Sequence, residues 1–475
     1  MRIVCLPIDS RPCNTQFVES LTQWGGGACV LPAPAEMDDF RRPAAFADSR
    51  AFLERELPQA DAAVINLEHW CFGGLLASRE YEVDEAEALN RVRALGALLR
   101  AYPDKPAYLS TIILRSSLST LREEDVAVYR AMTAYSVHTA RFARLGLPED
   151  AAAVREAAGR IPPELLARTR AVRKRNLAVN LAAVELAAEG LTASLSVLQE
   201  DTQTEGLPRW DQETILAKMR VANVRNVFLR NGADEAGALG AAQALRRGRP
   251  ALPVTFRWLG RADFVAPYED RPFRENLESA CAELGIQMAE DAETVVMVCC
   301  PEAGEQAESD VPVSEGHLRA IAQAVDAQIA AGRRVYLLDV MRANGGVFQL
   351  MGMLAEPDRL WGYSAWNTAS NAMGTLLAQL ATDHLRGAPN RRFLAERLLD
   401  DWLYQGRLRG VLTARLERAG EDIYCLKDKG RAEEALRALY EAELPARWPL
   451  KTLPACRVSL PWPRLFEIRA EAGNV

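Results

Sequence analysis

Histidine is scarce in this chain of 475 residues, which contains only four, and none of them forms an H-x-H or H-x-x-x-H pair. This spacing argues against a histidine-rich metal site. The nine cysteines are an odd number and include no C-x-x-C pair, so neither a zinc site nor a complete disulfide framework is expected. The sequence therefore predicts reduced thiols, a cytoplasmic location and no bound metal ion.

Motifs of several other protein classes are missing too. No apolar run approaches the length of a membrane span, and residues 1–7 are too short for a signal peptide. There is no Walker loop, no G-x-S-x-G elbow and no G-x-G-x-x-G after the first strand-like run. The net charge of −7 comes without a basic block, which argues against nucleic acid. We expect no cofactor and no membrane partner. The expected substrate is a small molecule or an oligosaccharide, and the sequence is compatible with a homo-oligomer.

What the chain does have is an ordinary globular composition, 49% hydrophobic and 25% charged, and a regular alternation of strand-like and helix-like segments. Short apolar runs predict strands at residues 3–8, 30–31, 62–67, 107–114, 195–198, 224–230, 254–258, 295–299, 335–340 and 361–365. Strands that alternate with helices predict a mainly parallel sheet with helices outside. We expect eight of these strands to close a TIM-like (β/α)₈ barrel, with an open doubly wound sheet as the alternative.

Two segments depart from this rhythm. Residues 122–190 are rich in Ala and Arg and mostly helical, which predicts an insertion longer than a βα unit needs. After residue 387 the pattern changes to helical stretches followed by a Pro-rich extended segment. We therefore predict a catalytic barrel domain at 1–387 and a C-terminal helical and extended module at 388–475.

Polar residues gather at the ends of the predicted strands. Ligands of α/β folds bind at the carboxyl ends of the strands, so these side chains form the candidate site. The most prominent are the adjacent carboxylates Asp234 and Glu235, on a tight loop between an apolar strand and an Ala-rich helix. The other candidates, all proposed to contact substrate, are Asp9, Arg11, Asn14, Glu200, Asp201, Asn231, Asp339, Asn344, Trp366 and Asn367.

Each candidate also has a purely structural explanation. Asn231 and Asp234 fit the N-terminal cap of the helix that follows them. Asp9 fits a turn-capping residue with Arg11 as its ion-pair partner. Trp366 fits a core aromatic, although tryptophan at a strand end also packs on the apolar face of a sugar ring. The whole set is harder to explain by capping than any one member, and its wealth of carboxylates indicates carbohydrate chemistry.

Three motifs resemble a known family. Over most of the chain, the sequence resembles a bacterial family known only as a domain of unknown function, through Pro7-x-Asp9-Ser10-Arg11-Pro12-x-Asn14, Asn231-Gly232-Ala233-Asp234-Glu235 and Trp366-Asn367-Thr368-x-x-Asn371-x-x-Gly374. The second motif also resembles the strand-end Gly-Gly-Asp-Glu segment of family-20-type β-N-acetylhexosaminidases and related β-N-acetylgalactosaminidases. Ala233 departs from that pattern, and the strand count before Asp234 is one or two too high for its barrel register.

The hexosaminidase resemblance implies a retaining glycosidase that works by substrate-assisted catalysis, with N-acetylgalactosaminides favoured. Asp234 would orient the 2-acetamido group, Glu235 would protonate the leaving oxygen, and Arg11 would hold sugar hydroxyls. One alternative is a metal-dependent hydrolase or lyase that uses Asp9, Glu200, Asp201 and Asp339 around a divalent cation. The other is a carbohydrate-binding protein without catalytic activity.

Overall fold

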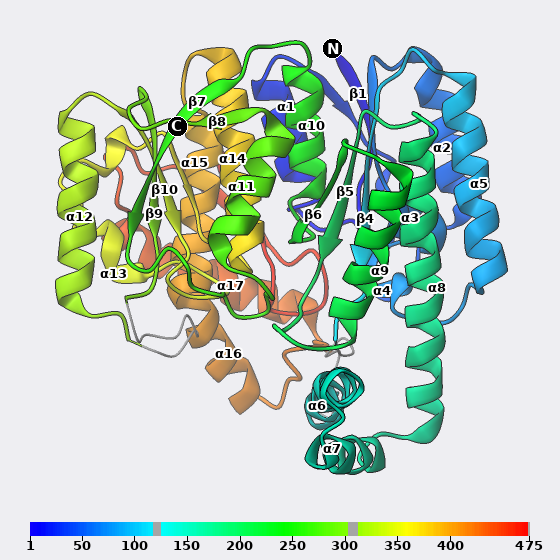
Figure 1. Ribbon diagram of the computed structural model, residues 1–475. Helices are drawn as coiled ribbons and strands as arrows, with labels where there is room; N and C mark the ends of the chain where they lie inside the picture. Colours follow the sequence, from blue (N-terminus) through cyan, green and yellow to red (C-terminus); the bar gives the residue numbers. More distant parts are fainter. Residues whose placement is uncertain (117–124, 303–311, 474–475) are drawn as a thin grey trace. The chain divides into compact units, whose positions relative to one another are not determined.

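The computed structural model describes residues 1–116, 125–302 and 312–473, and Figure 1 shows its ribbon. The chain divides into two compact units. Unit 1 consists of Met1–Glu19, Gly27–Ala244 and Tyr268–Asp270, and unit 2 consists of Ser20–Gly26, Leu245–Pro267 and Arg271–Val475. The division expected from the sequence, at residue 387, stays a prediction.

Unit 1 is built on a six-stranded sheet with the strand order β2-β1-β3-β4-β5-β6. Every residue of β3, β4 and β5 is buried, as expected for parallel strands that are covered on both faces. The carboxyl ends of the strands lie at one edge, because all the pairings are parallel. The strands are β1 (Arg2–Leu6), β2 (Ala28–Val30), β3 (Ala62–Asn66), β4 (Ala107–Ile113), β5 (Ser194–Gln199) and β6 (Val227–Asn231).

Helices cover both faces of this sheet. One face carries Val4, Ile65 and Leu109 into a hydrophobic core shared with α2, α3, α5, α8 and α9. On the other face α10 comes close through Gly240, where an added Cβ would lie 2.9 Å from Val64. The helices are α1 (Gln16–Trp24), which begins in unit 1, α2 (Phe46–Glu56), α3 (Leu67–Phe72), α4 (Leu75–Ser78), α5 (Glu85–Ala101), α8 (Pro163–Ala188), α9 (Leu207–Ala222), α10 (Ala236–Arg246) and the 3₁₀ turns η1 (Pro34–Glu36) and η2 (Leu57–Gln59).

The segment between β4 and β5 holds α6 (Asp125–Leu145) and α7 (Pro148–Gly159) before α8 returns to the sheet. Figure 1 shows α6 and α7 beyond the sheet, at the far end of the long helix α8. Pro148 and Pro163 stand in the first turns of α7 and α8, where a missing N–H costs nothing. The predicted helical residues 122–124 lie outside the described residues.

Unit 2 contains a five-stranded parallel sheet with the order β11-β10-β9-β7-β8 and a separate antiparallel hairpin, β12–β13. The strands are β7 (Leu252–Leu259), β8 (Ile286–Met288), β9 (Thr294–Cys299), β10 (Arg334–Asp339), β11 (Gly362–Ser364), β12 (Ala455–Ser459) and β13 (Arg469–Gly473). The helices are α11 (Phe273–Leu284), α12 (Glu315–Ala330), α13 (Phe348–Met351), α14 (Ala369–Arg386), α15 (Arg391–Arg397), α16 (Arg409–Arg418), α17 (Lys429–Arg447), the 3₁₀ turn η3 (Pro357–Arg359) and the π-helix η4 (Leu398–Leu408).

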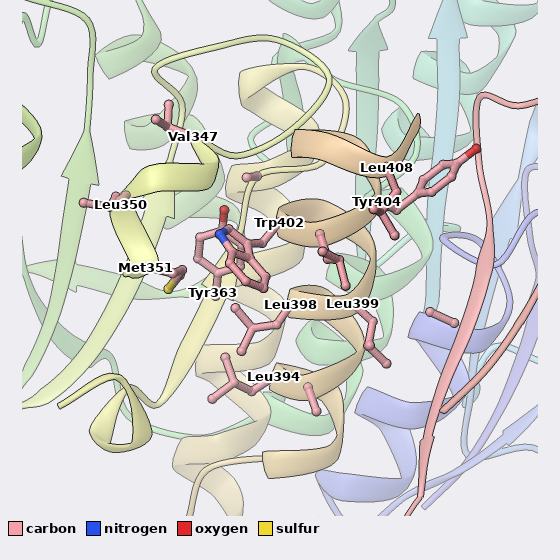
Figure 2. Close-up of a cluster of buried hydrophobic side chains, with 14 of the residues drawn as sticks. Val347, Leu350, Met351, Tyr363, Leu394, Leu398, Leu399, Trp402, Tyr404 and Leu408 are labelled. Carbon is pink, nitrogen blue, oxygen red and sulfur yellow. The ribbon is translucent and has the colours of Figure 1, made fainter. Parts of the chain in front are cut away.

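The π-helix η4 lies in the middle of the hydrophobic core of unit 2, and Figure 2 shows its side chains facing those of α13 and β11. The Trp402 ring stacks on Phe348 at 4.7 Å between centroids and 9° between planes. Trp402 also donates its indole N–H to the carbonyl of Phe348 at 2.8 Å. The residues that follow α14 therefore share one core with β9 and β10.

The prediction of an α/β protein with parallel sheets is confirmed. The more specific prediction, an eight-stranded barrel, stays a prediction. Within the described part of the chain, no helix combines the length and apolar character of a membrane span.

Candidate functional site

Arg11 is the centre of a buried polar cluster at the strand carboxyl ends of unit 1. It follows β1, and its Nε and Nη2 donate to Asp9 Oδ2 at 2.9 and 2.7 Å. Its Nη1 donates to Asp234 Oδ2 at 3.1 Å, and its Nη2 also reaches Asp234 Oδ1. The planar guanidinium thus binds both Asp9 and Asp234, a residue 223 positions further along the chain than Arg11. The structure brings together the predicted residues Asp9, Arg11 and Asp234.

Asp9 and Asp234 share this arginine, but the pKa of Asp9 is lowered and that of Asp234 is raised. Burial by itself raises the pKa of Asp9, yet the charge of Arg11 and hydrogen bonds from Arg11 and Asn14 outweigh it and hold that pKa below its usual value. Burial raises the pKa of Asp234, and the negative charge of Asp9 adds to that rise against the pull of Arg11. Carboxyl groups whose pKa values are pushed apart are the usual basis of acid–base chemistry.

Asn14, another predicted residue, belongs to the same cluster. Its Nδ2 donates to Asp9 Oδ1 at 2.8 Å, and its side chain is almost completely buried. The Asn14 Oδ1 atom is buried without a hydrogen-bond partner in the described part of the chain. A buried acceptor without a donor is costly, so a ligand hydroxyl or amide at this position would be stabilised.

Asp38 is a member of the cluster that the sequence-based reasoning missed. Its Oδ1 accepts the backbone N–H of Ser10 at 2.8 Å. Burial raises the pKa of Asp38 well above its usual value, and the charge of Asp9 adds to that rise. The preference of ligands for strand carboxyl ends could have identified Asp38, because it lies in the segment that follows β2. The strand predicted there from the sequence was only two residues long.

The loop after β6 places Glu235 differently from Asp234. Glu235 Oε2 accepts the N–H of Ala233 at 2.9 Å, and its other oxygen pairs with Arg230. Both side chains of this ion pair are completely buried. Gly232 has φ +131°, and a Cβ there would lie 2.0 Å from Glu235 Oε1. The Glu235 side chain therefore binds groups of its own strand and loop, whereas the Asp234 side chain binds Arg11. Asn231, predicted to contact substrate, is the buried last residue of β6.

Glu200 and Asp201 form a separate group of ion pairs after β5. Arg79 pairs with Glu200, and Arg115 Nη2 lies 2.7 Å from Asp201 Oδ2. The backbone N–H of Arg115 also donates to Glu200, at 3.4 Å. Their predicted contact with substrate stays a prediction. Arg79 directly follows the short helix α4, which gave no sequence signal.

The remaining predicted residues belong to unit 2. Asp339 ends β10 and accepts the N–H groups of Met341 (3.3 Å) and Val347 (2.7 Å). Asn344 and Asn367 both have positive φ, and the N–H of Asn344 donates to the carbonyl of Asn367 at 2.8 Å. Trp366 is buried against Phe466, with 6.1 Å between ring centroids. The expectation that these residues join Asp9 and Asp234 in one pocket stays a prediction.

Thr368, two positions after Trp366, caps α14 by accepting the N–H of Asn371 at 3.4 Å. In the described residues, no three His, Cys, Asp or Glu side chains are grouped so that they could hold a metal ion.

Comparison with known proteins gives one finding. A family model described as "Protein of unknown function (DUF4127)" matches residues 3–471. No curated protein and no solved structure matched the chain.

Proposed function

Because the chain belongs to the DUF4127 family, whose description states no activity, we propose a function from its own residues. We propose a glycoside hydrolase, a retaining β-N-acetylhexosaminidase that favours N-acetylgalactosaminides and uses substrate-assisted catalysis. The observation that carries the proposal is the position of Asp234, bound to Arg11 beside Asp9 and Asn14 at the strand carboxyl ends of unit 1.

The chemistry of this cluster suits a substrate whose 2-acetamido oxygen attacks its own anomeric carbon. Asp234, in its ionised form and hydrogen-bonded to Arg11, would orient the acetamido N–H and stabilise the positive charge that develops on the group. Arg11 and Asn14 would hold sugar hydroxyls, with the free Oδ1 of Asn14 as an acceptor. The barrel architecture and the substrate-binding roles of Asp339, Asn344, Trp366 and Asn367 are finer parts of the same proposal.

The reaction also needs a proton donor, which the sequence assigns to Glu235. Burial raises the pKa of Glu235, as a general acid requires, although Arg230 pulls it down. General acid catalysis contributes roughly 10² to 10⁴ in rate. Glu235→Gln should therefore slow glycosides with poor leaving groups by about that factor if Glu235 is the donor, and activated aryl glycosides much less.

The test is a panel of matched chromogenic glycosides with and without the 2-acetamido group, assayed with and without EDTA. We expect only the acetamido sugars to be cleaved, and Asp234→Asn to slow good and poor leaving groups alike. Equal cleavage of the plain galactoside would show that the substrate does not assist, and would contradict the mechanism. Loss of activity with EDTA would favour the metal-dependent alternative.

One observation favours a second function, sugar binding without catalysis. The carboxylates after β5 and β6 are paired with arginines, Glu200 with Arg79 and Glu235 with Arg230, as in a structural polar network. Tight binding of an N-acetylhexosamine by calorimetry, without turnover of any glycoside by the unaltered chain, would support that function.

A further inference from the structure

Three buried carboxyl groups, Asp9, Asp38 and Asp234, feel the charge of Arg11, and they are not equally stabilised. Asp9 and Asp234 each receive two hydrogen bonds from the guanidinium. Asp38 receives hydrogen bonds from backbone amides, that of Ser10 at 2.8 Å and its own, and from no side chain among the described residues. Asp38 is buried as well, with 6% of its surface exposed.

The charges of this cluster imply that one carboxyl keeps its proton. Arg11 supplies one positive charge against three acids, and neighbouring buried carboxylates cannot all ionise easily. The proton belongs on the group whose ionised form is least stabilised. Asp9 and Asp234 receive hydrogen bonds from the guanidinium, whereas the charge of Asp9 raises the pKa of Asp38 by more than the charge of Arg11 lowers it.

We propose that Asp38 is the proton donor of this site, in the role that the sequence assigns to Glu235. The inference rests on the proposed hydrolysis. As the acetamido oxygen forms its bond to the anomeric carbon and the glycosidic C–O bond breaks, the Asp38 proton passes to the leaving oxygen. The ionised Asp38 then takes a proton from a water molecule whose oxygen attacks the anomeric carbon and opens the oxazoline ring.

Two features of the chain support this role. Gly74, at φ +134°, lies beside the carboxyl group, because a Cβ there would be in van der Waals contact with Asp38 Cβ and Cγ at 3.4 Å and with Oδ2 at 3.6 Å. The Asn14 Oδ1 atom, in the same cluster, is an unused acceptor that a sugar hydroxyl would satisfy. Glu235, by contrast, would have to break a completely buried ion pair with Arg230 before it could act.

The first test is Asp38→Asn, whose amide oxygen still accepts from Ser10 but which has no acidic proton. We expect kcat/KM to fall by roughly 10² to 10⁴ for alkyl N-acetylhexosaminides and to change little for dinitrophenyl ones. The alkaline limb of the pH–rate profile should disappear. Asp39→Asn, an exposed neighbour, is the matched control and should behave like the unaltered chain. If Glu235→Gln shows the leaving-group dependence instead, the proposal is overturned.

A second readout does not depend on activity. The ¹³C-carboxyl resonance of Asp38 in the full chain, identified by its loss in Asp38→Asn, should titrate well above the usual value of about 3.9. A resonance that titrates at the usual value overturns the inference even if glycosides are cleaved. A high titration in a chain that cleaves no glycoside would instead show that the proposed function, and the donor role with it, is wrong.

Discussion

At the scale of single residues, Arg11 determines the state of the cluster after β1. A lysine could not replace it, because an ammonium is a point charge and cannot form the parallel hydrogen bonds that reach Asp9 and Asp234 together. All three side chains are nearly excluded from water, so each charge depends on its partners rather than on hydration.

Arg11→Met should therefore destabilise the folded chain by about 3–5 kcal/mol, the usual cost of removing one partner of a buried ion pair. The lowered pKa of Asp9 contributes stability that is present above its unfolded-state pKa of about 3.9 and is lost as the pH falls through the folded value. The difference in unfolding free energy between the two chains, measured with urea, should thus be largest above about pH 5 and shrink toward pH 3. Arg11→Met with Asp234→Asn should recover part of the loss, and no recovery would show that the ion pair is not the cause.

The residue types of this cluster could be predicted from the sequence, but their partners could not. Asp9, Arg11, Asn14 and Asp234 were identified because each follows a strand-like run. That Glu235 pairs with Arg230 was not visible, because Arg230 lies inside an apolar strand and the chain turns back toward it through Gly232, whose φ is positive.

At the scale of elements, the loop between β6 and α10 separates two adjacent carboxylates that the sequence treats as a pair. Gly232 allows this because its φ of +131° is accessible only to glycine and because no Cβ intervenes between it and Glu235. The loop thereby holds Glu235 in its ion pair with Arg230 and positions Asp234 to pair with Arg11.

Gly232→Ala should break this arrangement. An added Cβ would meet Glu235 Oε1 at 2.0 Å and Arg230 Nη1 at 2.9 Å, so the ion pair must move. Gly190→Ala is a matched control, since Gly190 also has a positive φ of +75° but nothing within 4 Å of its Cβ position. We expect the control to cost about 1–2 kcal/mol, the usual left-handed penalty, and Gly232→Ala to cost clearly more in urea unfolding. Equal costs would mean that the contact with Glu235 is unimportant.

The elements themselves were largely predictable, because continuous apolar runs between helical segments identify buried parallel strands. The π-helix η4 was not, since residues 398–408 carry an ordinary amphipathic pattern, and the stacking of Trp402 on Phe348 joins residues 54 positions apart. Nor was β8, a strand of three residues of which only Ile286 is buried.

At the scale of the whole molecule, strand rhythm predicted the α/β class but not the division into two sheets. The alternation of strand and helix continues across the boundary near residue 245, because β6, α10 and β7 follow one another in the same rhythm as within a sheet. Which strands pair is decided by contacts between distant segments, and these leave no local signal in one sequence.

Buried acids across both units predict how the stability of the molecule depends on pH. Burial raises the pKa of Glu68, Asp383 and Asp400 to about 7 and that of Asp339 to about 6. The folded chain therefore holds more protons than the unfolded chain between about pH 4.5 and 7, and its unfolding free energy must fall as the pH rises through this range. Burial lowers the pKa of His69 to about 4, which opposes this trend below pH 6.5. This is one histidine against four acids, so the fall in stability with rising pH should dominate.

We expect the unfolding free energy of the full chain, measured in urea, to be greatest near pH 5 and to decline toward pH 8. Glu68→Gln isolates one contribution, because its amide oxygen can still accept from Ile112 N–H while the titration is removed. A shift from 4.5 to about 7 corresponds to on the order of 3 kcal/mol above pH 7, so this variant should flatten the decline by roughly that amount. Glu54→Gln, at an exposed ion pair with Arg50, should leave the curve unchanged. A stability that rises from pH 5 to pH 8 would mean that these acids are ionised in the folded chain and stabilised by partners within it.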